Sequence, residues 1–284
     1  MTETVHGITY SKPEVVLLQE TGIGTSEVAA RSCYDSFDNS ENDCIRAIDT
    51  LNQMGGTNTD LINNIEHSDL LDTLAWTHFH HSILEHANLT YLIKGTSRAV
   101  LQEHARHRIQ AISVRSTRYT MQQILHAFNA TSICLLGDSK ATFTAFIKEL
   151  DMFTVCGTAE VIDIHNMYDK LHHQLIAIGN DTFADITMSK MAKEVYKART
   201  SYQTPRELYD QLCACKDKRN VGDPFKWIVT DNWKVDMVVT FNLRSLKNYL
   251  TLRDSGAAYF GIRHLAQAMK EVTPSKYLNL IIKD

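Results

Sequence analysis

The chain has 284 residues, of which 44% are hydrophobic and 22% charged, as is ordinary for a globular protein. The net charge of −4 argues against general nucleic-acid binding, since nucleic-acid-binding proteins present broad basic surfaces. No run of about eighteen apolar residues is present and no signal peptide opens the chain, so we expect no membrane span and a cytoplasmic protein. The six cysteines are scattered, which predicts reduced thiols.

The domain organisation follows from the scarcity of chain breakers. Only 4 prolines and 12 glycines occur, and no low-complexity linker separates two parts of the chain. We therefore predict a single domain over residues 1–284, with a mostly helical and divergent middle segment at about 127–220.

The first third of the chain begins with one predicted strand, and the predicted helices follow it. Hydrophobic periodicity and capping residues predict a strand at 14–21, a helix opened by Thr25 or Ser26, a helix at 41–54, a polar loop to about residue 65, and a helix at 68–77 capped by Ser68.

A histidine-rich turn, His78–His86, leads into the next predicted elements. The same signals predict a strand at 88–94 closed by Gly95, a helix from Arg98 to about Arg108 capped by Thr96 or Ser97, strands at 227–230 and 235–241, and helices at 243–252 and 257–272, with Pro274 beyond the last.

The histidine turn admits three interpretations. Its histidines lie beside Glu85, but their order differs from a metal-binding helix, in which two histidines stand four residues apart and a glutamate follows the first. Histidines that cap or pack before a strand are a simpler explanation, and a contact between one imidazole and a cofactor is the third. We expect no metal ion here.

An arginine cluster occupies residues 106–118. It has no lysine, apolar residues run between its arginines, and arginine suits bidentate contact with phosphate or carboxylate. Structural salt bridges are the simplest explanation, and nucleic-acid binding is disfavoured by the acidic background. A site for a nucleotide or another phosphorylated ligand is favoured, although no glycine-rich phosphate loop is present.

A third polar group lies on the helix after residue 242. Asn242, Arg244, Asn248 and Arg253 alternate with an apolar face formed by Leu243, Leu246, Tyr249 and Leu250. This pattern fits a solvated helix face. It also fits the reading of a heterocycle edge, because an amide offers both a donor and an acceptor.

Together these segments resemble the flavin-dependent thymidylate synthases. Arg106-His107-Arg108, followed after seven residues by Ser116, is similar to the signature of that family, and Thr117-Arg118-Tyr119 extends it. The family order is also matched by His80 to His86, by Asn242 to Arg253, and by Ala29 to Tyr34.

The resemblance implies an α+β fold with helices packed on a mixed or antiparallel sheet, and a homotetramer with ligand sites between protomers. It implies reductive methylation of dUMP to dTMP with FAD, NADPH and 5,10-methylenetetrahydrofolate. The residues expected to contact FAD are His80, Ser82, Arg106, His107, Arg108, Asn242, Arg244 and Asn248. Those expected to bind dUMP are Glu103, Arg106, Val114, Arg115, Ser116, Thr117, Arg118 and Arg253, with Lys226 from another subunit.

Arg253 is the residue expected to carry the chemistry. A guanidinium beside N3 of uracil stabilises the deprotonated, enolate-like ring, which makes C5 nucleophilic. No cysteine stands in the setting that a nucleophilic thymidylate synthase needs.

Several positions depart from the common family pattern, namely Val114, Glu103 and Lys226. Val114 leaves only backbone groups for its dUMP contact, and Lys226 offers a point charge in place of a fork. Two alternatives therefore stay open: a dUMP hydroxymethylase on the same scaffold, and a catalytically silent nucleotide-binding protein.

Overall fold

The computed structural model describes residues 2–5, 8–48, 59–117, 231 and 233–283, with isolated positions between 173 and 186. The chain divides into two compact units. One comprises Met1–Lys12, Ser97–Ala99 and Arg115–Lys234, and the other comprises Pro13–Thr96, Val100–Val114 and Val235–Asp284. Most of the segment at 127–220 lies outside the described residues, so the single domain with a helical middle stays a prediction.

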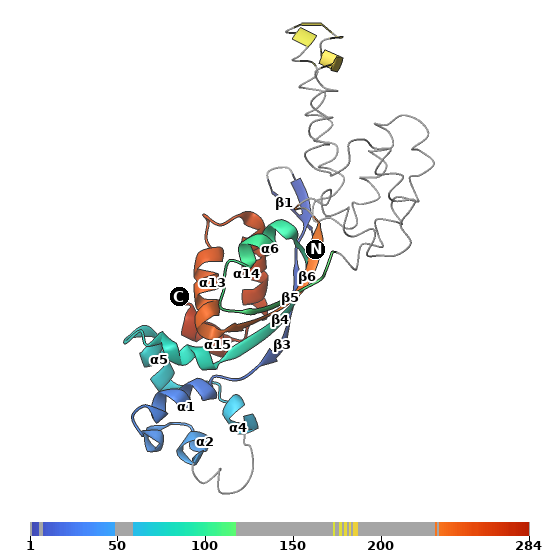
Figure 1. Cartoon of the computed structure of the whole chain (residues 1–284). Coiled ribbons are helices and arrows are strands. Elements are labelled where there is room, and N and C mark those ends of the chain that lie inside the picture. Colours follow the sequence, from blue (N-terminus) through green and yellow to red (C-terminus); the bar gives the residue numbers. More distant parts are fainter. Residues whose placement is uncertain are drawn as a thin grey trace, which may run out of the picture. The chain divides into compact units, whose positions relative to one another are not determined.

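The second unit is built on a four-stranded sheet in the order β3-β4-β6-β5 (Figure 1). The strands are β3 (Glu14–Glu20), β4 (Asn88–Ser97), β5 (Ala111–Val114) and β6 (Lys234–Asn242). β3 pairs antiparallel with β4, and β5 pairs antiparallel with β6. The hydroxyls of Thr90 and Thr240 lie 2.9 Å apart and Gly95 N donates to Asp236 Oδ1, so β4 and β6 also run in opposite directions.

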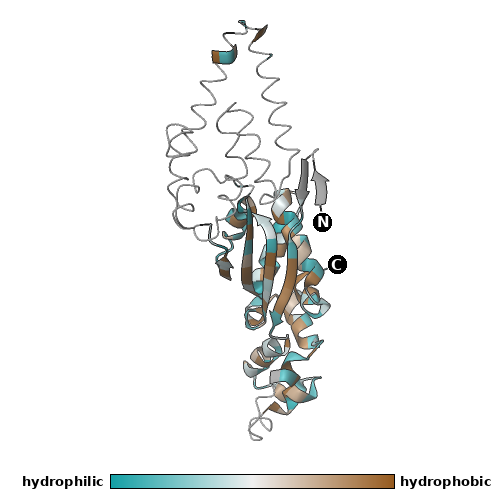
Figure 2. Ribbon diagram, turned by 90° about the vertical axis from the view of Figure 1, so that its right-hand side faces the viewer, coloured by the Kyte–Doolittle hydropathy of each residue, from teal (hydrophilic) through white to brown (hydrophobic). Residues whose placement is uncertain are grey.

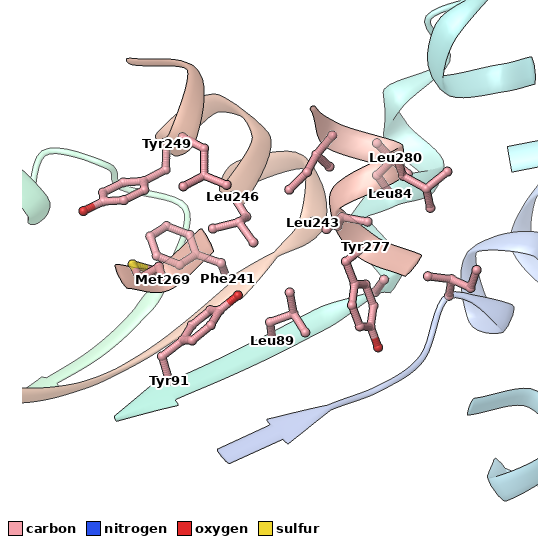
Figure 3. Packing of buried hydrophobic residues seen from close by; sticks show 14 of the residues in the cluster. Leu84, Leu89, Tyr91, Phe241, Leu243, Leu246, Tyr249, Met269, Tyr277 and Leu280 are labelled. Carbon is pink, nitrogen blue, oxygen red and sulfur yellow. The ribbon is translucent and has the colours of Figure 1, made fainter. Parts of the chain in front are cut away.

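The core lies on one face of this sheet, because alternate residues of its central strands are apolar. Along β4, Leu89, Tyr91 and Ile93 are buried, while the residues between them are less so. Helices α13 (Leu243–Arg253), α14 (Phe260–Val272) and α15 (Ser275–Ile281) cover this face, as Figures 1 and 3 show. Each fully buried large side chain contributes about 1.5–3 kcal/mol. The predicted α+β fold is confirmed, and the sheet of this unit is antiparallel.

The opposite face of the edge strand keeps apolar groups at the surface. Val16 and Leu18 of β3 remain 50% and 53% exposed, and Figure 2 shows hydrophobic and hydrophilic residues as brown and teal bands along the strands. This face of β3 therefore leaves two apolar side chains half-exposed.

Short helices complete the second unit at the chain segments that flank β3 and β4. These are α1 (Gly24–Ser32), η1 (Phe37–Asn39), α2 (Asp43–Arg46), α4 (Thr59–Asn63), α5 (Asp69–Trp76), η2 (His81–His86) and α6 (Arg98–His104). α1 packs against η2 and α5, and α13 also packs against η2. This packing places the histidine turn between α1 and α13.

A buried carboxylate joins the elements around α1. Glu27 is 0% exposed, and its Oε1 accepts hydrogen bonds from Arg31 Nε and Ser40 Oγ, each at 2.6 Å. Its Oε2 accepts from Asn42 Nδ2 at 2.9 Å. Burial raises the pKa of Glu27, but hydrogen bonds from Ser40, Arg31, Ser68 and Asn42 outweigh it, so the pKa lies below its usual value and the group is ionised.

The described part of the first unit is small. Strands β1 (Thr2–Val5) and β2 (Ile8–Ser11) pair antiparallel, and the backbone N–H of Arg98 donates to the carbonyl of Trp233. Among all the described residues, no helix has the length and apolar character needed to cross a bilayer.

Several boundaries differ from the sequence predictions. α1 begins at Gly24 without a side-chain cap, so the predicted caps Thr25 and Ser26 lie inside the helix. β4 continues through Gly95, which has a positive φ of 69°, and ends at Ser97. α6 ends at His104, earlier than the predicted Arg108.

The sequence analysis did not predict β1, β2, η1, α4, β5 or α15. α4 occupies part of the predicted polar loop, β5 forms only by pairing with β6, and α15 follows Pro274. Pro274 lies beyond the end of α14 at Val272, as predicted, and it is also the N-cap of α15.

Candidate active site

Arg253 is held at the C-terminal end of α13 by groups from α6 and the turn after it. Its Nη1 lies 2.9 Å from Glu103 Oε2, and its Nη2 donates to the carbonyl of Glu103 at 3.4 Å. Its Nε donates to His107 Nε2 at 2.9 Å. Three residues that the sequence analysis assigned to the site thus meet, although 146 positions separate Arg253 from His107.

The contact with Arg253 determines the proton position on His107. A guanidinium N–H can only donate, so His107 Nε2 accepts and the proton of the neutral ring is on Nδ1. Burial and then the positive charge of Arg253 lower the pKa of His107, against an opposing effect of Glu103. His107 is therefore neutral at neutral pH. It orients Arg253 by accepting a hydrogen bond, and it adds no second positive charge beside the guanidinium.

Arg106 and Arg108 lie on either side of His107, and both are exposed. Neither forms an ion pair with any described residue, in contrast to Arg253. Structural salt bridges therefore do not account for these two guanidiniums within the described chain. Two exposed guanidiniums next to a third that is held in one orientation are suited to bind an anion with several oxygens.

A second group of predicted residues lines a cleft of about 390 Å³. His80 and Ser82 come from the start of η2 and Arg244 from the first turn of α13. Arg244 Nη1 lies 2.5 Å from Glu85 Oε1, in an ion pair whose side chains are 55% and 47% exposed. The cleft thus combines an imidazole, a hydroxyl and a solvent-accessible guanidinium.

The two asparagines of α13 have different settings. Asn242 is the N-cap of the helix, where its Oδ1 accepts a hydrogen bond from Ser245 N at 2.8 Å. Its side-chain oxygen therefore has a structural partner, which leaves the amide N–H₂ for a ligand. Asn248 is exposed on the same helix.

The other predicted dUMP residues are not brought to Arg253 by the described structure. Val114 ends β5 and is 36% exposed. Arg115, Ser116 and Thr117 follow it but belong to the first unit, and their roles stay predictions. Arg118 and Lys226 lie outside the described residues.

The structure also identifies site residues that sequence reasoning did not assign. Cys33, Tyr34 and Phe79 line the cleft beside His80, and Phe79 adopts a positive φ of 55° that a bulky residue rarely takes. The segment from Ala29 to Tyr34 had been noted for its family resemblance, so that signal could have pointed to Cys33 and Tyr34. Nothing in the hydrophobic pattern marks Phe79.

Side chains that could bind a metal ion converge elsewhere among the described residues. Glu41, His67 and Asp69 offer ligand atoms within 4.8 Å of one another, and all three are exposed. His67 Nε2 lies 2.8 Å from Asp69 Oδ1, and the backbone N–H of Asp69 donates to Glu41. These three residues therefore form hydrogen bonds with one another at the surface.

Comparison with known proteins identifies the family. The family model described as "Thymidylate synthase complementing protein" matches residues 16–276. The flavin-dependent thymidylate synthase of Campylobacter jejuni (strain RM1221) is 26% identical over 264 residues, covering 93% of each chain. That of Wolinella succinogenes is 28% identical over 263 residues, covering 93% of this chain and 94% of the relative.

Solved structures agree at the level of the fold. Thymidylate synthase X from Helicobacter pylori, crystallised with FAD and dUMP, matches with a TM-score of 0.54 and 22% identity, covering 95% of this chain and 97% of that one. With the family match over residues 16–276, this shows that the chain belongs to the family of flavin-dependent thymidylate synthases.

Proposed function

We propose that this chain catalyses the reductive methylation of dUMP to dTMP, with FAD, NADPH as reductant and 5,10-methylenetetrahydrofolate as carbon donor. The observation that carries the proposal is the guanidinium of Arg253, oriented by His107 and Glu103 beside the exposed Arg106 and Arg108.

The residues present suit a nucleotide and a dinucleotide. Arg106 and Arg108 can donate hydrogen bonds to phosphate oxygens, and charge-assisted hydrogen bonds of this kind contribute about 1.5–3 kcal/mol each. His80, Ser82 and Arg244 supply the donors around the cleft that would hold part of FAD. FAD, when bound, supplies the reducing hydride that converts the transferred one-carbon unit to a methyl group.

The chemical contribution of the chain is made by Arg253. Placed at N3 and the adjacent carbonyl of uracil, its charge stabilises the electron-rich ring and so raises the nucleophilicity of C5. Glu103 and His107 keep the guanidinium in one orientation, which reduces the reorganisation needed when charge develops on the ring.

The experiment is an assay of dTMP formation by the holoenzyme and its Arg253→Ala variant. We expect the variant to retain flavin but to lose about 100-fold or more in kcat, as removal of a preorganised charge donor usually does. Arg46→Ala is the matched control, since Arg46 forms an exposed pair with Asp43 on α2. Purified protein that is colourless and releases no flavin on heating would count against the proposal.

The same assay separates the alternatives. The hydroxymethylase alternative is motivated by Val114 and Glu103, and it predicts a product that mass spectrometry finds heavier than dTMP by one oxygen. A silent nucleotide-binding protein would bind dUMP without oxidising NADPH.

We further propose that the protein works as a homotetramer with sites shared between subunits, Lys226 reaching dUMP from a neighbouring copy. The half-exposed Val16 and Leu18 support an assembly to the extent that an interface would bury these two apolar side chains of β3. Light scattering coupled to gel filtration tests the assembly. Val16→Asp should shift it toward smaller species.

A further inference from the structure

A buried histidine, His104, follows Glu103 in the chain, close to the contacts that orient Arg253. His104 is the last residue of α6 and is 0% exposed. Its ring stands edge-on to Phe241 and Tyr249, at centroid distances of 5.7 and 5.1 Å. Its Nδ1 lies 3.2 Å from the hydroxyl of Tyr249, which is itself fully buried.

The protonation state of this pair follows from its burial. Burial lowers the pKa of His104 to about 4, with smaller contributions from His107, when that ring is protonated, and from Arg253, so the imidazole of His104 is neutral. Burial raises the pKa of Tyr249 far above its usual value, so its hydroxyl keeps its proton. Two neutral polar groups are therefore enclosed together in the apolar core.

The direction of their hydrogen bond follows from counting unsatisfied groups. If Nδ1 accepts from the Tyr249 hydroxyl, only the Nε2–H of His104 lacks a partner among the described residues. In the opposite tautomer, Nδ1–H would donate to the Tyr249 oxygen. Both the hydroxyl proton of Tyr249 and Nε2 of His104 would then lack a partner, which is less favourable in free energy than one unsatisfied group. Gln110 Nε2 donates to the backbone carbonyl of His104 at 3.0 Å, and Gln110 opposes the lowering of the His104 pKa.

This pair is connected to the reactive guanidinium by direct contacts. The ring of Tyr249 meets the ring of His107 at a centroid distance of 4.8 Å, and His107 accepts from Arg253 Nε. Tyr249 and Arg253 lie one turn apart on α13, and Glu103 and His104 are neighbours on α6. In Figure 3, Tyr249 stands beside Phe241 at the edge of the core.

We propose that His104 and Tyr249 are positioning residues, which fix the imidazole of His107 and through it the orientation of Arg253. The inference rests on the proposed function, in which Arg253 activates uracil. If these two positions served only to pack the core, phenylalanine or leucine would be sufficient there. The buried hydrogen bond adds a fixed distance between the ends of α6 and α13, where both halves of the Arg253 contact are anchored.

The test compares Tyr249→Phe with the matched control Tyr277→Phe in the holoenzyme. Both changes remove one buried hydroxyl and keep the ring, but the Tyr277 hydroxyl accepts from Gly22 N, remote in sequence from the site. We expect Tyr249→Phe to lower kcat for dTMP formation about 10-fold, as small misplacement of a reacting group does. Flavin content and the KM for dUMP should stay within about twofold, and Tyr277→Phe should leave kcat within about twofold.

Two further variants show whether the effect passes through Arg253. In an Arg253→Lys background, Tyr249→Phe should change the residual kcat by less than about twofold, because effects on one shared group are not additive. His104→Gln, which keeps a hydrogen-bond acceptor, should retain more activity than His104→Leu.

Equal kcat values for Tyr249→Phe and Tyr277→Phe would overturn the positioning role while leaving the proposed function intact, and so would full additivity with Arg253→Lys. A wild-type protein that forms no dTMP would instead overturn the proposed function, and with it the positioning role of His104 and Tyr249.

Discussion

Replacing Glu27 with glutamine tests how strongly the cleft depends on one buried charge. The carboxylate is fully buried, and it accepts hydrogen bonds from Arg31, Ser40 and Asn42. Glutamine keeps the shape but places an N–H₂ against groups that are themselves donors. It also leaves the guanidinium of Arg31, with a side chain only 7% exposed, without its counter-charge.

The magnitude can be bounded in two ways. Three hydrogen bonds to a charged group at about 1.5–3 kcal/mol each give an upper range, whereas breaking a buried ion pair by removing one partner costs about 3–5 kcal/mol. We expect a loss of about 4 kcal/mol in the free energy of unfolding. At about 2–4 °C per kcal/mol for a large domain, the melting temperature should fall by about 8 °C or more.

Chemical and thermal denaturation followed by circular dichroism provide the measurement. Asp43→Asn is the matched control, since it removes a 90% exposed carboxylate from the pair with Arg46 and should cost less than about 1 kcal/mol. Because the pKa of Glu27 lies below 4.5 in the fold, its contribution is present above that pH and is lost as the pH falls through the folded pKa. A Glu27→Gln variant as stable as Asp43→Asn would refute this reasoning.

Three shorter predictions follow from other sites. The folded pKa of His104, about 4, lies below the usual histidine value of 6.5, so the unfolded chain binds the extra proton first. Stability should therefore fall by about 3 kcal/mol as the pH drops from 6.5 to 4, a slope that denaturation of His104→Gln should lack. Gly22→Ala should lower the free energy of unfolding by more than about 2 kcal/mol, because the φ of Gly22 is +74° and the added Cβ would lie 2.5 Å from Asn63 Cα. Gly95 has a φ of +69° but open space around it, so Gly95→Ala should lower the same quantity by only about 1 kcal/mol. Arg244→Ala removes an exposed ion pair, so the melting temperature should change little while the flavin content measured by absorbance falls.

The amphipathic helices were the part of the fold that local sequence could predict. Leu243, Leu246, Tyr249 and Leu250 recur at helical spacing and are all buried, and Ser68 caps α5 by accepting from Leu71 N as expected. These features depend on contacts between residues three or four apart, so they are legible in a single sequence.

Elements that depend on distant partners were missed or misplaced. β5 is only four residues long and exposed, and it exists because Ala111–Val114 pairs with β6 across more than a hundred positions. The need for glycine at position 24 is likewise set by a tertiary contact, since an added Cβ there would lie 2.3 Å from the carbonyl oxygen of Ile62. Neither partner is visible in local periodicity.

The types of residue in the site, by contrast, were determined by the sequence. An arginine cluster without lysine on an acidic chain indicated an anion site, and family resemblance selected Arg253 as the reactive group. Only the tertiary structure decided which of these residues meet. It joins Arg253 to His107 and Glu103, because α13 and α6 cover the same face of one sheet. It also places His104 against Tyr249, because polar groups enclosed by that core must find their hydrogen-bond partners within it.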